Sequence, residues 1–127
     1  MDKNFIVKNF KADWIGKAAD YVGNPSKMLE LVKDAKSLLG KVGLSDVLDD
    51  LTLLIDYVTD IAKGRYKGYS IVKLTIAVAA IIYVVSPIDL IPDAIPVMGF
   101  TDDVTVILWA MKQIHDELQK YKMVMGK

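Results

Sequence analysis

The chain has 127 residues, enough for one modest hydrophobic core and too few for two. Its 16 basic and 16 acidic residues cancel, which argues against nucleic acid as a partner, because nucleic-acid-binding domains are usually basic. It has no cysteine, so disulfides, thiol nucleophiles and cysteine-ligated zinc are excluded. Hydrophobic residues make up 53%, so we expect part of the surface to be apolar. Such a surface suits a protein partner, self-association or a membrane.

The spacing of apolar residues and the positions of capping residues predict five helices. They cover about residues 3–22, 25–39, 45–63, 70–86 and 101–123. No hairpin turn joins alternating segments, so we predict an all-α fold, a single-domain helical bundle of about five helices with a Pro/Asp-rich turn between helices 4 and 5. This one domain spans residues 1–127; residues 1–63 are N-terminal helices of unplaced role, and residues 64–122 are the part to which the family resemblance given below assigns the core.

The N-terminal segment lacks the continuous apolar centre of a signal peptide. We therefore expect a cytoplasmic protein that reaches at most the inner face of the membrane. The apolar side chains of this segment lie opposite four lysines, a pattern shared by interfacial membrane helices and by helices that pack on a core.

The fourth predicted helix is apolar nearly all round after Lys73, which is typical of the central helix of a bundle or of a helix in lipid. Its uncharged run from Leu74 to Val85 is about 18 Å long, whereas a bilayer span needs about 20 residues. A single span is therefore disfavoured and a buried helix is preferred. A re-entrant hairpin over residues 71–100 stays as an alternative.

A basic linker precedes this helix. It contains two tyrosines and four cations: Lys63, Arg65, Lys67 and Lys73. This pattern is typical of an anchor at a membrane interface and also of a solvated loop.

The stretch after the fourth helix combines prolines with carboxylates. Pro87, Pro92 and Pro96 prevent a long helix from passing through it. Four aspartates accompany them: Asp89, Asp93, Asp102 and Asp103. Aspartates after prolines and at helix starts are usually caps, so we expect a structural clamp or docking surface. The alternative is a divalent metal site for Mg²⁺, Ca²⁺ or Mn²⁺, because these cations prefer oxygen ligands.

No complete catalytic constellation is visible, so we predict that the protein is not an enzyme and holds no cofactor. His115 is the only histidine, and we expect it at a helix edge rather than as a metal ligand. The sequence contains neither a phosphate-binding glycine loop nor a serine with a plausible histidine partner.

The segments "RYKGYS" and "IIYVVSPIDLIPDAIPVMGFTDD", with the helix that follows them, resemble the YkvA-like family of small bacterial proteins built around a domain of unknown function. The resemblance covers about residues 64–121. It implies membrane association and a shared fold, and it implies no reaction.

We therefore predict a non-enzymatic binding or adaptor module that engages a protein partner or itself, with peripheral membrane contact as a further expectation. One alternative is a metal-dependent hydrolase or metal-binding domain that uses the four aspartates. Another is a small integral membrane protein with the re-entrant hairpin.

Overall fold

The computed structural model of the chain describes residues 16–39, 47–85 and 99–127, except for the side chains of residues 99–103. A short helical segment at residues 16–22 comes first. The helices that follow are α2 (Pro25–Lys36), α3 (Leu48–Ala62), α4 (Ile71–Val85), α5 (Gly99–Gln113) and α6 (His115–Met125). The described residues contain no strand, so the prediction of an all-α bundle is confirmed.

The start of α2 follows from its capping residues. Asn24 adopts an extended backbone, and its side chain accepts a hydrogen bond from the amide of Lys27 at 3.2 Å. Pro25 occupies the first helical position, where its missing N–H costs nothing because that donor has no partner within a helix. The predicted boundary between the first two helices is therefore correct.

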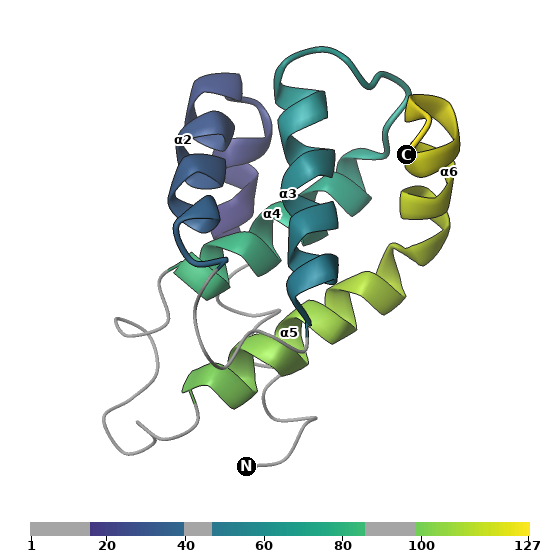
Figure 1. Cartoon of the computed structure of the whole chain (residues 1–127). Coiled ribbons are helices and arrows are strands. Elements are labelled where there is room, and N and C mark those ends of the chain that lie inside the picture. The colour runs from purple at the N-terminus through teal and green to yellow at the C-terminus, as the bar shows by residue number, and fades with distance from the viewer. Residues whose placement is uncertain (1–15, 40–46, 86–98) are drawn as a thin grey trace.

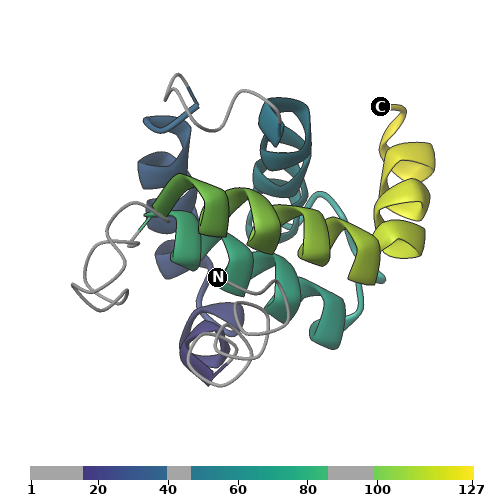
Figure 2. The same cartoon turned by 90° about the horizontal axis from the view of Figure 1, so that it is seen from below.

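The helix α4 forms the centre of the molecule. Nine of its fifteen residues are buried, including the whole run from Ala77 to Val84. It packs against α2, α3 and α5, and Figures 1 and 2 show α2 and α3 standing side by side while α4 and α5 cross their lower ends. The prediction that this apolar helix is the buried central helix of a bundle is therefore confirmed.

The predicted fifth helix is in fact two helices. Ile114 has backbone angles of φ −115° and ψ 21°, which lie outside the helical region and separate α5 from α6. Its amide still donates to Ala110 and its carbonyl still accepts from Leu118, at 3.0 and 2.9 Å, so the torsions of one residue redirect the chain. As Figure 1 shows, α6 then stands upright beside α3. No proline or glycine marks this break in the sequence.

The break also changes which side of α5 is buried. Helical spacing of the apolar residues along the predicted helix 101–123 would place Leu108 in the core, but it is 47% exposed. Val106, Ile107 and Ala110 are buried in its place, together with Ile114 at the break. The expectation for Leu108 assumes one straight helix over residues 101–123. The segment instead forms α5 and α6, so the side of α5 that is buried differs.

Candidate functional site

The linker between α3 and α4, residues 63–70, lies over two buried carboxylates. Asp60, in the last turn of α3, is 3% exposed, and Glu117, in the first turn of α6, is 6% exposed. Charged groups are rarely buried unless they are paired and hydrogen-bonded. In Figure 1 the linker runs from the upper end of α3 towards α6 before it enters α4. The two carboxylates therefore lie where three parts of the chain meet.

Asp60 binds the beginning of the linker. Its Oδ1 accepts from Nε of Arg65 at 2.8 Å and forms an ion pair with Nη2 of the same side chain at 2.7 Å, and its Oδ2 accepts from the Tyr121 hydroxyl. Lys127 Nζ lies 3.4 Å from the same Oδ2. The backbone carbonyl of Asp60 accepts from the amides of Arg65 and Tyr66. Side chain and backbone of one residue thus fix the turn that leaves α3.

The environment of Asp60 favours its charged form. Burial by itself raises the pKa of this carboxyl, but hydrogen bonds from Tyr121 and Arg65 and the positive charge of Lys127 lower it, and the net result is a pKa below the usual value. Asp60 is therefore an anion with its own internal counterions.

Glu117 binds the end of the linker. Its Oε2 accepts from the Tyr57 hydroxyl at 2.7 Å and from the backbone amide of Ser70 at 2.9 Å. One turn further along α6, Lys120 Nζ donates to the carbonyl of Gly68 at 2.9 Å. In the single long helix predicted over residues 101–123, Glu117 would lie on the polar side that faces solvent. It is buried instead because α6 turns this side towards α3 and the linker.

Three tyrosines fill the space between the carboxylates. The ring of Tyr121 meets those of Tyr57 and Tyr66 edge to face, at centroid distances of 5.4 and 5.2 Å. Burial raises the pKa of each of the three phenols, and the charge of a neighbouring carboxylate raises it further. The Tyr66 hydroxyl is buried without a hydrogen-bond partner among the described residues. We call Tyr57, Asp60, Tyr66, Glu117 and Tyr121 the tyrosine–carboxylate cluster.

The cluster was not predicted, although the spacing of its residues contains a signal. Tyr57 and Asp60 are three residues apart on α3, and Glu117 and Tyr121 are four residues apart on α6. Residues four apart share a helix face. The sequence does not show that the two faces meet, because that contact depends on the break at Ile114.

The outer side of the linker is basic and continues into an apolar pair. Lys63, Arg65 and Lys67 are exposed. Ile71 and Val72, the first two residues of α4, are 57% and 67% exposed, although nine other residues of that helix are buried. We call Lys63 to Lys73 the basic–apolar segment.

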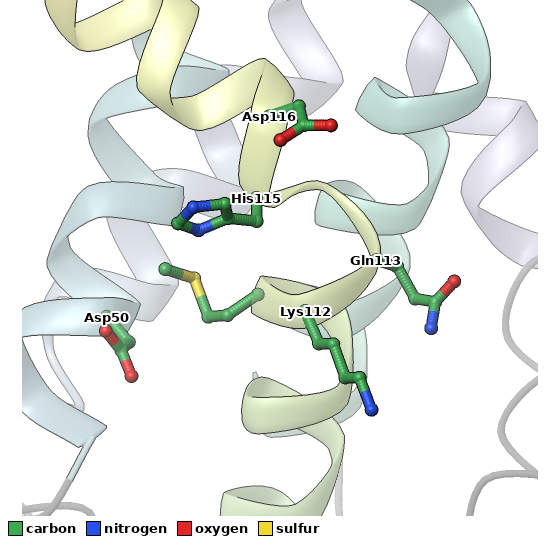
Figure 3. Close-up of a pocket in the computed structure, with 6 residues that line it drawn as sticks. Asp50, Lys112, Gln113, His115 and Asp116 are labelled. Carbon is green, nitrogen blue, oxygen red and sulfur yellow. The ribbon is translucent and has the colours of Figure 1, made fainter.

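A second feature is an open depression of about 530 Å³ between α3, α5 and α6. Its lining residues are Asp50, Met111, Lys112, Gln113, His115 and Asp116. Figure 3 shows Asp50 and His115 on the left of the depression, whereas the side chains of Lys112 and Gln113 extend away from them to the right. His115 is exposed at a helix edge, as expected. Within the described part of the chain, no three histidine or acidic side chains converge as metal ligands would.

The predicted metal ligands are not among the side chains that the structure describes. Asp89 and Asp93 fall in residues 86–98, outside the described ranges, and Asp102 and Asp103 belong to α5 by backbone only. The metal site and the structural clamp both stay predictions.

Comparison with known proteins gives a consistent family assignment. Residues 73–109 match the model of a protein family of unknown function, DUF1232. The chain is also 32% identical over 89 residues to the uncharacterised membrane protein YkvA of Bacillus subtilis (strain 168), an alignment that covers 68% of this chain and 82% of the relative. No solved structure matches the chain.

The relative contradicts one of our expectations. We predicted a cytoplasmic location, and the protein that shares these 89 residues is named a membrane protein. The prediction was wrong because it gave the missing signal peptide more weight than the expected apolar surface. None of the described helices has the length and hydropathy that a membrane span requires.

Proposed function

The chain belongs to the YkvA-like family of DUF1232 proteins, and we propose that it is a non-enzymatic binding module that attaches to the surface of a membrane. The first turn of α4 is the part of the molecule that enters the interface. The linker and the tyrosine–carboxylate cluster hold this turn in place.

The observation that carries the proposal is the exposure of Ile71 and Val72. Complete burial of such a side chain contributes about 1.5–3 kcal/mol relative to exposure. Since each is more than half exposed, transfer of both into an apolar phase would contribute on the order of 3 kcal/mol. That amount suits reversible contact rather than insertion. It also agrees with a relative that is named a membrane protein.

A binding role is favoured over catalysis because the buried ionisable groups are bound to one another. Asp60 accepts from Arg65 and Tyr121, and Glu117 accepts from Tyr57 and the Ser70 amide. A general acid or base needs a lone pair or proton directed at a substrate. These hydrogen bonds instead stabilise the linker.

The proposal is tested by sedimentation with phospholipid vesicles. The variant Ile71→Ser/Val72→Ser removes the exposed pair on α4. Its matched control is Met123→Ser/Val124→Ser, which removes an equally exposed apolar pair on α6, where the two residues are 84% and 63% exposed. Because all four side chains face solvent, both variants are expected to melt close to the wild type.

We expect the wild type to sediment with vesicles and the α4 variant to lose at least about tenfold in partition, while the α6 variant binds normally. Two results would contradict the proposal. One is a wild type that stays in the supernatant, which would favour the predicted protein partner. The other is an equal loss of binding in both variants.

A further inference from the structure

The basic–apolar segment belongs to a long part of the chain without acidic residues. Between Asp60 and Asp89 the sequence contains no aspartate or glutamate, and all its cations lie in the first half, at Lys63, Arg65, Lys67 and Lys73. The chain as a whole has equal numbers of acids and bases. The positive charge is therefore concentrated here, and it lies next to the exposed pair at the start of α4.

The two carboxylates that contact this segment are directed inwards. Asp60 and Glu117 are both buried, and their oxygens accept from donors of the protein itself. Asp60 pairs with Arg65 of the segment and with Lys127, and Glu117 lies 3.9 Å from Lys120 Nζ. Within the described part of the chain, Lys63, Lys67 and Lys73 form no ion pair. The positive charge of the segment that no carboxylate offsets is therefore that of these three lysines.

Cations lie on both sides of the apolar pair in the sequence, an exposed one at Lys67 and a half-buried one at Lys73. Lys73 directly follows Val72, and Lys67 lies four residues before Ile71, in the linker that α6 holds through Gly68 and Ser70. Apolar side chains that enter the acyl boundary, with cations at the level of the headgroups, are the arrangement of an interfacial membrane segment. The cations complement a negatively charged surface and would add nothing on a neutral one.

From this concentration of positive charge beside the apolar pair we infer that the module selects membranes rich in anionic phospholipid and that the basic–apolar segment recognises their charge. This inference rests on the proposed function, because it names the lipid that the same surface binds. Each lysine near an anionic surface raises the partition about fivefold, and salt weakens the effect. The two lysines nearest the apolar pair together account for about a 25-fold preference.

The test compares vesicles of phosphatidylcholine alone with vesicles that also contain phosphatidylserine. The variant Lys67→Gln/Lys73→Gln removes two cations of the segment. Its charge-matched control is Lys33→Gln/Lys36→Gln, which removes two exposed lysines from the last turns of α2. Both variants change the net charge by the same amount, so a difference between them reports the position of the charge.

We expect the wild type to bind anionic vesicles at least about tenfold more tightly than neutral ones. The segment variant should lose most of that preference, the α2 variant should keep it, and added salt should weaken it. Equal binding to the two kinds of vesicle would overturn this inference and leave the proposed function standing. Equal losses in the two variants would overturn it as well. Binding to neither kind would overturn the proposed function itself.

Discussion

Asp60 keeps a full charge inside the protein because donors from three parts of the chain surround it. Arg65 comes from the linker, Tyr121 from α6, and Lys127 follows α6. Arg65 donates a hydrogen bond through Nε to Oδ1 and forms an ion pair with the same oxygen through Nη2, and hydrogen bonds between charged groups are stronger than neutral ones. One carboxylate therefore connects α3, the linker and the C-terminal residues.

The lowered pKa of Asp60 predicts how stability depends on pH. The folded-state pKa is below the unfolded value, so the stabilisation is fully present above about pH 4 and is lost as the pH falls through the folded pKa. We expect Asp60→Asn to be less stable than the wild type by about 2 kcal/mol at neutral pH. The difference should shrink below about pH 4, because the wild-type carboxyl is then protonated as well.

Urea unfolding at a series of pH values measures this difference. Asp116→Asn, at an exposed position on α6, is the control and should follow the wild-type curve. A difference between Asp60→Asn and the wild type that stays constant down to the lowest pH would contradict the assigned role of Asp60.

At the scale of single residues, the sequence predicted caps better than buried charges. Asn24 and Pro25 act as expected because a cap is a local interaction over a few residues. Asp60 and Glu117 were not predicted because their partners lie 61 and 60 residues away, at Tyr121 and Tyr57. Only a tertiary contact decides whether a carboxylate on a helix faces water or a phenol.

At the scale of elements, α6 is the support of the linker. It contributes Glu117, which accepts from Ser70, and Lys120, which donates to Gly68. Both contacts require α6 to stand beside α3, and that position follows from the break at Ile114. Had α5 continued straight, Glu117 would lie on the exposed side that the sequence predicted.

This support can be tested by replacing Glu117. Glu117→Ala leaves the Tyr57 hydroxyl and the Ser70 amide without their acceptor, and each unsatisfied buried donor costs about 1–3 kcal/mol. We expect a loss of about 3 kcal/mol in the free energy of unfolding. The amide of Ser70 should also exchange its hydrogen much faster than in the wild type.

Glu117→Gln is the matched control, because its side-chain carbonyl can still accept a hydrogen bond. It should retain most of the protection of Ser70. If the alanine variant is as stable as the wild type and protects Ser70 equally well, α6 does not hold the linker.

At the scale of the whole molecule, the sequence predicted the class of fold and its centre. The helix α4 is apolar on nearly all sides, unlike a surface helix, and its uncharged run is too short to span a bilayer. Burial within a bundle was therefore the prediction. The same reasoning could not predict where the apolar surface lies. Ile71 and Val72 are as hydrophobic as their neighbours, and only the packing of the other helices leaves these two uncovered.

This uncovered turn is the part of the molecule through which we propose that a protein built from short helices attaches to a membrane. The lysines of the linker and the exposed pair on α4 are neighbours in the sequence, and α6 holds the linker between them through Gly68 and Ser70. The proposal therefore requires that Val72 enters the membrane interface while Met123, exposed on α6, stays in water.

The measurement that tests this claim most directly uses a fluorophore that responds to the polarity around it. Because the chain has no cysteine, Val72→Cys and Met123→Cys each provide a single site for the label, at two exposed positions on different helices. With vesicles that contain phosphatidylserine, we expect a blue shift of the emission at position 72 and none at position 123. Emission that stays unchanged at position 72, or an equal shift at both positions, would contradict the account.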